Sequence, residues 1–427
     1  MQTNFTSDQR ARPEVREMES ILRKCVHCGF CLSDCPTYSI LGDERDSPRG
    51  RIYLIKELIE SDGKSAKFVM PHLDKCLSCL ACTSVCPSGV DYQHYVDFAR
   101  SYIEPFTKRT IPDRFLRWFL ARTIPNPHWF RLSLVAASLL RPISGLLGRR
   151  IKSVIKLLPK KIPLNSTLSI PQSFPAVGKP RLRVALLAGC AQQVLRPSIN
   201  EATIRLLNRL GCEVVLSKGI GCCGALVNHM GRQNEAREFA KANITSWNNE
   251  IEERGLDAIV VNTSGCGTEV KGYSHLFKND EIWHGMAERI SFLTKDITEL
   301  LTEIDFPTSA NMQHHTIVYH DACSLLHGQK IEQEPRLLLK SVGFDVKEIP
   351  GKHFCCGSAG VYNLIQTEIA EILKFRRLEA IEKIEAEIVA TGNIGCQVQL
   401  QTGLKRPVVH TVELLDWATG GPSPPGT

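Results

Sequence analysis

Residues 25–36 read CVHCGFCLSDCP and residues 76–87 read CLSCLACTSVCP, and these two stretches decide the fold of the first part of the 427-residue chain. Each follows the pattern C-x2-C-x2-C-x3-C-P, in which three thiolates surround one iron–sulfur cube and the fourth thiolate binds the other cube. Structural zinc sites use pairs of cysteines rather than runs of four, so zinc is the weaker alternative. The two runs therefore predict a mainly helical ferredoxin-type domain with two 4Fe–4S clusters.

Each cluster is expected to take three ligands from one run and the fourth from the other. Residues 50–60 lie between the runs and carry apolar side chains at helical spacing, so a helix is expected there, with residues 46–51 capping its start. The predicted ligands are Cys25, Cys28, Cys31 and Cys86 for the first cluster, and Cys76, Cys79, Cys82 and Cys35 for the second.

The C-terminal part of the chain repeats itself at an offset of 133 residues, which carries Cys190 to Cys323 and Cys222 to Cys355. In both copies a lone cysteine is followed by a Cys-Cys-Gly sequence and then by one more cysteine. A duplicated half-domain explains this spacing. The candidate metal ligands are Cys190, Cys222, Cys223 and Cys266 in the first copy, and Cys323, Cys355, Cys356 and Cys396 in the second.

Short β-rich runs alternate with helical stretches in both copies, which predicts α/β units with parallel strands. Because the cysteines follow these strands, they are expected to converge at the carboxyl edge of each sheet and to bind a further iron–sulfur cluster in each copy. Buried structural cysteines, redox-active thiols and zinc sites are the alternatives, and Cys212, which has no counterpart in the second copy, is expected in the core. The expected strands are residues 184–187, 213–216 and 258–261, then 317–319, 345–349 and 387–389.

The composition of the chain is typical of a soluble globular protein, with 43% hydrophobic and 23% charged residues. Its apolar stretches are too short to cross a bilayer, and the N-terminus lacks the features of a secretory signal. A cytoplasmic location is therefore expected, where disulfides are rare and metal binding best explains the abundance of cysteine.

These motifs, in this order, resemble the iron–sulfur subunits of bacterial glycolate oxidase, within the wider group of proteins with paired cysteine-rich CCG domains. In heterodisulfide reductase-type CCG domains a C-x-x-C stands where this sequence has Thr263 and Asn393. The resemblance is carried by residues 25–38 (CVHCGFCLSDCPTY), 46–56 (DSPRGRIYLIK), 188–192 (AGCAQ), 221–225 (GCCGA), 263–267 (TSGCG), 355–360 (CCGSAG) and 393–397 (NIGCQ).

The resemblance implies an electron-transfer subunit of an oxidoreductase complex. The sequence has no recognisable flavin or nicotinamide motif, so the chain is expected not to oxidise glycolate alone. The family implies partner subunits that carry FAD, oxidise glycolate to glyoxylate, with D-lactate as a further substrate, and pass electrons through this chain to a membrane acceptor, a quinone. The alternatives are a heterodisulfide-reductase-like thiol/disulfide subunit and the iron–sulfur subunit of another FAD-linked dehydrogenase, for D-lactate or glycerol-3-phosphate.

Residues 100–161 are strongly basic, because lysine and arginine far outnumber the two acidic residues, Glu104 and Asp113. Aromatic and aliphatic residues lie between these charges, and four prolines divide the segment into short helices. Three interpretations remain open: a connector packed on the cysteine-rich domains, a peripheral contact with the inner membrane, and a docking site for a flavin subunit. Nucleic acid is not an expected partner, since no recognition fold is visible.

The predicted fold is a multidomain α+β protein. It comprises a helical ferredoxin domain, a basic helical linker and a duplicated α/β cysteine-rich domain. The expected boundaries are 1–22 for an N-terminal leader, 23–100 for the ferredoxin domain, 101–178 for the linker, 179–305 and 306–420 for the CCG repeats, and 421–427 for a disordered tail.

Overall fold

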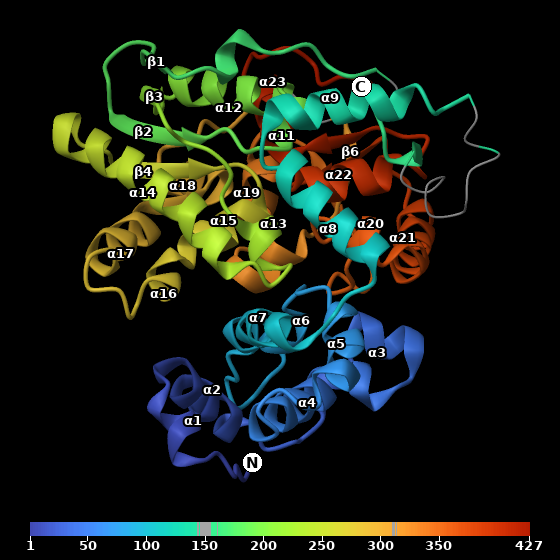
Figure 1. Ribbon diagram of the computed structural model, residues 1–427. Helices are drawn as coiled ribbons and strands as arrows, with labels where there is room; N and C mark the ends of the chain where they lie inside the picture. The colour runs from blue at the N-terminus through green and yellow to red at the C-terminus, as the bar shows by residue number, and fades with distance from the viewer. Residues whose placement is uncertain (143–144, 146–154, 160, 310–311, 313) are drawn as a thin grey trace.

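The computed structural model describes residues 1–142, 145, 155–159, 161–309, 312 and 314–427 (Figure 1). Part of the predicted basic linker, including Arg149, Arg150 and Lys152, therefore lies outside the described residues. The N-terminal domain lies below the two cysteine-rich repeats in Figure 1, and the linker helices cross the front of the repeats. Among the helices described, none has the length and apolar character needed to span a bilayer.

The N-terminal domain is helical, and its core gathers side chains from four of its helices. Leu22, Ile55, Leu58 and Tyr95 are fully buried in this core. Ser47 caps the central helix by accepting a hydrogen bond from the Gly50 amide at 2.9 Å, and Pro48 follows at the first helical position. The helices are α1 (Ser7–Ala11), α2 (Pro13–Lys24), α3 (Pro36–Leu41), α4 (Pro48–Glu60), α5 (Ala66–Asp74), α6 (Ala81–Ser84) and α7 (Tyr92–Ile103).

The expected leader, residues 1–22, is part of this domain rather than a separate segment. Val15, Met18 and Leu22 recur at helical spacing on α2 and are buried against α4 and α7. The Thr3 hydroxyl donates to the buried Glu19 carboxylate at 2.6 Å, which holds the N-terminus against the same helix. An amphipathic helix buries its apolar stripe, and here the ferredoxin core supplies the partner surface.

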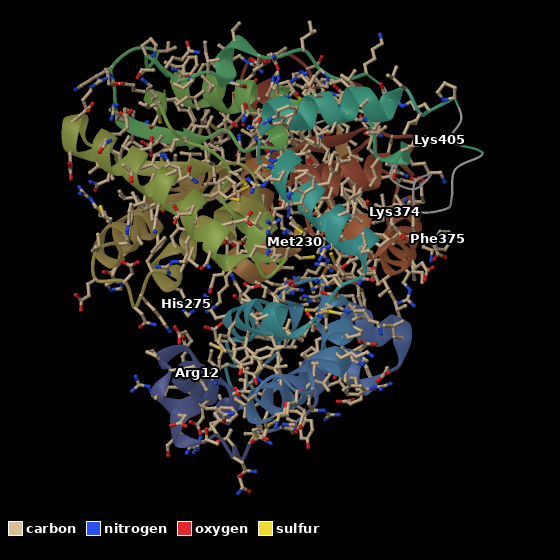
Figure 2. All side chains as sticks on the ribbon, in the orientation of Figure 1. Arg12, Met230, His275, Lys374, Phe375 and Lys405 are labelled. Atoms are coloured by element: carbon tan, nitrogen blue, oxygen red, sulfur yellow. The ribbon has the colours of Figure 1, made fainter. Side chains whose placement is uncertain are left out.

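The described part of the linker includes two long helices and one strand. Helices α8 (Ile111–Thr123) and α9 (Pro127–Ser138) lie against the cysteine-rich repeats (Figure 1). Leu120 and Ala121 of α8 pack with Val227 and Met230, and Figure 2 places Met230 near the centre of the molecule. Strand β1 (Gln172–Phe174) then pairs antiparallel with the first sheet, an edge strand that is too short to show an alternating pattern.

The first repeat is a five-stranded sheet in the order β1-β3-β2-β4-β5, with helices on both faces. Strands β2 to β5 are parallel to one another, which requires crossover helices between them. The strands are β2 (Leu182–Leu187), β3 (Cys212–Leu216), β4 (Ala258–Val261) and β5 (Thr294–Asp296). The helices are α11 (Gln192–Leu195), α12 (Ser198–Arg209), α13 (Ala225–Asn228), α14 (Gln233–Arg254), α15 (Ser264–Lys271), α16 (Tyr273–Leu276), α17 (His284–Leu293) and α18 (Ile297–Glu303).

The second repeat is a four-stranded parallel sheet in the order β7-β6-β8-β9. This order matches β3-β2-β4-β5 of the first repeat strand for strand, which confirms the duplicated α/β fold. The strands are β6 (Thr316–Tyr319), β7 (Asp345–Glu348), β8 (Ile388–Thr391) and β9 (Val408–His410). The helices are α19 (Glu334–Ser341), α20 (Tyr362–Ile365), α21 (Thr367–Glu382), α22 (Ile394–Gln401) and α23 (Thr411–Ala418), and a π-helical segment, Ser324–Gln329, follows β6.

The two repeats share one apolar core. The last helix of each repeat packs on the first long helix of the other, α23 on α12 and α18 on α19. Arg205 and Arg209 of α12 bind the buried Asp416 carboxylate of α23 at 2.6 and 2.5 Å. Residues 421–427, expected to be disordered, end in a turn in which Pro424 is buried and accepts from the Thr427 amide.

Direct hydrogen bonds join the ferredoxin domain to both repeats. The Tyr362 hydroxyl donates to the Lys75 carbonyl at 2.8 Å, and Ser84 is hydrogen bonded to His327 at 2.7 Å, both ties to the second repeat. On the other side, His229 of the first repeat lies 3.4 Å from the Asp97 carboxylate.

Candidate metal centres

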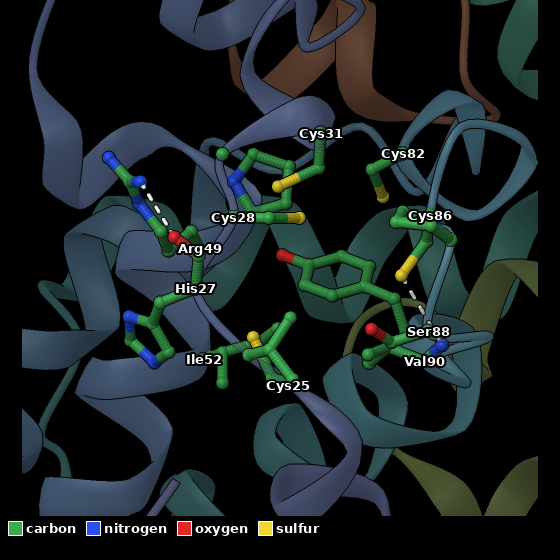
Figure 3. A pocket seen from close by; sticks show the side chains of 15 residues that line it. Cys25, His27, Cys28, Cys31, Arg49, Ile52, Cys82, Cys86, Ser88 and Val90 are labelled. Atoms are coloured by element: carbon green, nitrogen blue, oxygen red, sulfur yellow. Dashed lines mark hydrogen bonds between the residues drawn. The ribbon is translucent and has the colours of Figure 1, made fainter.

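The four cysteines predicted for the first cluster line one pocket of the ferredoxin domain (Figure 3). Cys25 ends α2, Cys28 and Cys31 follow in the next loop, and Cys86 comes from the second cysteine run. The loop turns sharply because His27 and Gly29 adopt positive φ angles of 57° and 86°. Burial raises the pKa of the Cys31 thiol to about 11, so a cation is needed to keep a thiolate there.

The four cysteines predicted for the second cluster line a neighbouring pocket. Cys35 precedes α3, Cys76 and Cys79 lie in the loop after α5, and Cys82 is in α6. Cys82 also lines the first pocket, so the two pockets adjoin. Burial raises the pKa values of the Cys79 and Cys82 thiols well above their ordinary range.

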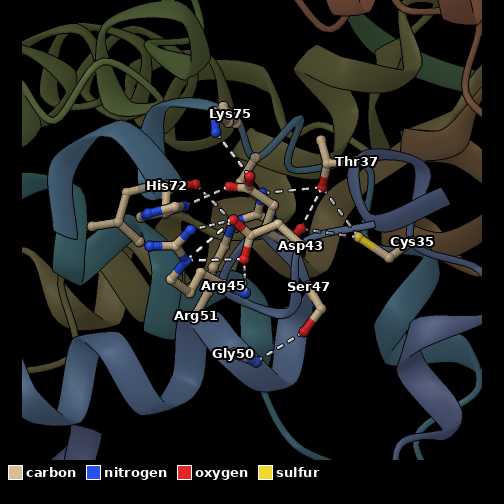
Figure 4. A network of polar contacts seen from close by, with 12 residues as sticks. Cys35, Thr37, Asp43, Arg45, Ser47, Gly50, Arg51, His72 and Lys75 are labelled. Atoms are coloured by element: carbon tan, nitrogen blue, oxygen red, sulfur yellow. Dashed lines mark hydrogen bonds and ion pairs between the residues drawn. The ribbon is translucent and has the colours of Figure 1, made fainter. Parts of the chain in front are cut away.

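A buried arginine, which the sequence analysis did not single out, lies beside the second pocket (Figure 4). The Arg51 guanidinium is 1% exposed and donates to the His72 carbonyl at 2.8 Å and to the Thr37 hydroxyl at 3.0 Å. Its charge is balanced by Asp46, which is held at 2.8 Å by both His72 and Lys75. The buried Asp46 carboxylate thus joins Arg51, His72 and Lys75.

Arg51 and a second buried arginine, Arg100, act on the Cys76 thiol. Arg100 donates to the Cys76 carbonyl at 2.7 Å and to the Ser78 hydroxyl at 2.6 Å. Burial by itself would raise the pKa of Cys76, but the positive charges of Arg51 and Arg100 hold it below its ordinary value. The site therefore favours the thiolate, the form that binds metal.

The four candidate ligands of the first repeat meet at the carboxyl edge of its sheet. Cys190 follows β2, Cys222 and Cys223 follow β3, and Cys266 is in the first turn of α15, after β4. Their thiols are close enough to shift one another's pKa, Cys190 with Cys222, Cys222 with Cys223, and Cys223 with Cys266. Cys212, in contrast, is buried in the core shared by the repeats, as the sequence analysis predicts.

The second repeat gathers its candidate ligands in the same way. Cys323, Cys355, Cys356 and Cys396 follow β6, β7 and β8, and their thiols are close enough to shift one another's pKa. Gly357 directly follows Cys355 and Cys356 and has a φ of +84°. A Cβ atom at this position would lie 2.5 Å from the Ala370 carbonyl oxygen. Glycine is therefore required for the cysteine loop to pack on α21.

The second ferredoxin pocket lies directly against the cysteines of the second repeat. Leu77, Cys355, Tyr362 and Leu373 form one apolar cluster, with Cys79 and Cys323 packed against it. The charges of Cys79 and Cys323 are close enough to raise the pKa of the Cys79 thiol, after the larger effect of burial. The thiols of Cys79 and Cys323 thus lie close together where the two domains meet.

A further set of buried titratable groups lies between the ferredoxin domain and the first repeat. Glu269 of α15 accepts from Asn228 at 3.1 Å, and burial raises the pKa of its carboxyl to about 7. His229 and Asp97 are paired nearby, and the negative charge of Asp97 raises the pKa of His229 despite burial. These residues lie far apart in the sequence, so no spacing signal identifies them.

The fold and the four cysteine sets together define an iron–sulfur protein in which a dicluster ferredoxin domain is followed by a duplicated cysteine-rich domain. Residues 21–90 match the model of the 4Fe-4S dicluster domain, and residues 184–271 and 317–401 each match that of the Cysteine-rich domain, CCG.

The chain belongs to the family of glycolate oxidase iron–sulfur subunits. It is 39% identical to the glycolate oxidase iron–sulfur subunit of Escherichia coli strain K12, over 98% of this chain and 99% of the relative. It is 34% identical to the probable glycolate oxidase iron–sulfur subunit of Bacillus subtilis, over 94% and 95% of the two chains. Lactate utilization protein A of Bacillus subtilis is 27% identical over 55% of this chain and 99% of its own length.

Among solved structures, a hypothetical protein from Helicobacter pylori has a similar fold. Its TM-score is 0.56 at 10% sequence identity, and the match covers 96% of this chain and 73% of that one. This likeness concerns the fold alone.

Proposed function

We propose that this chain carries electrons from flavin-containing partner subunits that oxidise glycolate to glyoxylate, with D-lactate as a further substrate, to a quinone. The observation that best supports this route is the contact between Cys79 of the ferredoxin domain and Cys323 and Cys355 of the second repeat. Each of the four cysteine sets would hold one iron–sulfur cluster, the ferredoxin sets binding 4Fe–4S clusters, and such clusters supply one-electron transfer when bound. FAD is expected on the partners rather than on this chain.

The residues of this chain prepare the sites for that role. The charges of Arg51 and Arg100 lower the pKa of Cys76, and the amides of Gly224 and Gly357 donate to the Cys222 and Cys355 sulfurs at 3.4 Å. Hydrogen bonds to ligand sulfurs and buried positive charge raise the reduction potential of iron–sulfur centres. Local contacts thus tune three of the four proposed centres.

The division of labour between subunits gives the first prediction. The purified chain, loaded with iron and sulfide, is expected not to reduce a dye with glycolate, because glycolate oxidation needs a two-electron acceptor. Adding the flavin subunits should restore dye reduction with glycolate. Dye reduction by the chain alone, at a rate comparable to that of the complex, would contradict the proposal.

The exposed face of α8 and α9 is proposed to rest on the surface of an anionic membrane. Ile111, Phe115 and Trp118 of α8 and Trp129 and Leu139 of α9 are 50–75% exposed, while the opposite face of α8 packs on the repeats. The exposed basic side chains are Arg114 and Arg122 on α8 and Lys108 just before it. An apolar face flanked by basic residues suits an anionic lipid surface, at about 1 kcal/mol per Lys or Arg near it.

This surface gives the second prediction. The double variant Phe115→Ser and Trp118→Ser is expected to bind vesicles of phosphatidylglycerol at least about tenfold more weakly, because two aromatic side chains lose their burial in lipid. Salt should weaken the binding of the unchanged protein, since exposed charges are screened within about 8 Å at physiological ionic strength. Vesicle flotation measures both effects.

Phe375 provides a matched control, because it is 66% exposed on α21 at the periphery of the second repeat (Figure 2). Phe375→Ser should leave vesicle binding unchanged. Equal binding by all three proteins would rule out the membrane role. If the α8 variant instead fails to bind the flavin subunits, the face is a docking site for that partner.

A further inference from the structure

The second repeat contains a buried histidine whose ring has no partner in the described part of the chain. His320 follows β6, is 0% exposed, and leaves both Nδ1 and Nε2 without a hydrogen bond among the described residues. Its backbone is fixed in the sheet edge, where the His320 amide donates to the Ala390 carbonyl at 2.8 Å. A side chain so placed must be satisfied by something that the protein binds, since an unpaired buried polar group costs about 1–3 kcal/mol.

The surroundings of His320 point to a metal centre as its partner. One ring nitrogen of His320 and the sulfurs of Cys356 and Cys396 lie within 4.8 Å of one another, and all three residues are buried. A neutral imidazole beside two thiols is a donor set that suits iron or zinc.

The first repeat has no equivalent of this histidine. The offset that carries Cys190 to Cys323 places Leu187 at the position of His320. The strands confirm the match, because Val184 pairs with Ala258 and, 133 residues later, Ile317 pairs with Ile388. Leu187 is 1% exposed and packs in the apolar core of its repeat.

We propose that His320 is a nitrogen ligand of the metal centre of the second repeat, so that this centre has mixed imidazole and thiolate ligands while the first repeat has thiolates alone. The inference rests on the proposed function in one respect, that the cysteines of the second repeat bind a metal centre. It goes beyond that function because it adds a ligand outside the Cys-Cys-Gly pattern and makes the two repeats chemically unequal.

The two repeats also differ in the charge of the side chain that holds the cysteine loop. The cysteine loop of the first repeat is held by the neutral Asn243, which accepts from the Gly221 amide at 2.9 Å and donates to the Cys222 carbonyl at 2.9 Å. In the second repeat the corresponding loop is held by Arg377, which donates to the Lys352 and Phe354 carbonyls and is 3% exposed. The second repeat thus has a buried cation where the first has an amide.

The buried cation raises the reduction potential of the second repeat relative to that of the first. The neutral imidazole adds no negative charge to the four thiolates that each repeat supplies. A buried guanidinium stabilises the more negative, reduced state. The centre of the second repeat therefore accepts electrons in preference to that of the first.

The test compares His320→Leu, which reproduces the first repeat, and His320→Cys, which restores a ligand, in the full-length protein purified anaerobically. Pulsed EPR of protein labelled with ¹⁵N-histidine should show a nitrogen strongly coupled to one centre, and this coupling should be lost in both variants. His320→Cys should retain the centre at a lower midpoint potential, because a thiolate replaces a neutral ring. His410→Asn is the control, since His410 is also buried in this repeat but caps α23.

The metal content of Cys356→Ser separates two hypotheses: that the second repeat binds metal, and that His320 is one of its ligands. If this variant loses no metal, the second repeat binds none and the proposed function fails at this site. If it loses metal but the labelled protein shows no nitrogen coupling, or His320→Leu keeps the same spectrum and potential, His320 is not a ligand and the inference is overturned. If the lost metal is zinc, X-ray absorption at the zinc edge gives the answer: one nitrogen scatterer that His320→Leu removes supports the inference, and an all-sulfur shell overturns it.

Discussion

Replacing Cys79 by alanine is expected to abolish electron transfer through the chain. Cys79 lines the second ferredoxin pocket and also packs against the cysteines of the second repeat, so its loss removes a ligand at the point where the two domains meet. The variant should lose one of the 4Fe–4S signals in EPR and about four irons per chain, and the complex should fall to background turnover with glycolate.

The matched control for this experiment is Cys212→Ala. Cys212 is fully buried but lies in the core shared by the repeats, away from the four cysteine sets. The Cys212→Ala variant should keep its full iron content and turnover and lose only some thermal stability, because a small cavity replaces the thiol. Full iron content and turnover in Cys79→Ala would show that the second ferredoxin cluster is not on the route.

Replacing Arg51 by methionine is expected to destabilise the ferredoxin domain by about 3–5 kcal/mol, because it leaves the buried Asp46 carboxylate with one charged partner fewer. The Thr37 hydroxyl and the His72 carbonyl also lose their donor. The pKa of Cys76 should rise, since one of the two cations that lower it is gone. Thermal unfolding of the metal-loaded protein, together with the rate at which a chelator removes iron, measures both effects.

Arg49→Met is the control for that variant. Arg49 lies two residues away, but its side chain is 29% exposed and pairs with the more exposed Glu44 at 2.7 Å. Such pairs contribute about 0–1 kcal/mol, so the unfolding temperature should change little. Similar losses in the two variants would mean that burial of Arg51 has no special role.

Much of the fold follows from local patterns in the sequence. The cysteine runs identify the ferredoxin domain because cluster ligation demands a fixed spacing, and the expected strands of the repeats match β2, β3, β4, β6, β7 and β8 within two residues at either end. The two four-cysteine sets of the repeats also meet at the sheet edges where parallel strands end, as expected. Spacing and strand order are local information, so a single sequence carries them.

The parts that the sequence did not reveal depend on contacts between distant residues. Arg51 looks like one more charge on an amphipathic helix, and only the fold shows that it is buried between Thr37 and His72. His320 looks like an ordinary residue after a strand until β8 brings Cys396 beside it. A comparison of the two repeats at the offset of 133 residues gives the signal that could have found it, because Leu187 and His320 differ in chemistry at the same position.

The hydrogen bonds that join the ferredoxin domain to both repeats have a consequence for the speed of the carrier. Tyr362 and His327 on one side and His229 on the other hold the ferredoxin domain at two separate places. When an electron carrier moves one domain between donor and acceptor, its rate is limited by that domain motion, on the microsecond-to-millisecond scale. In this chain the fold itself sets the distances between the cysteine sets. The rate of electron transfer then depends on the reduction potentials of the centres.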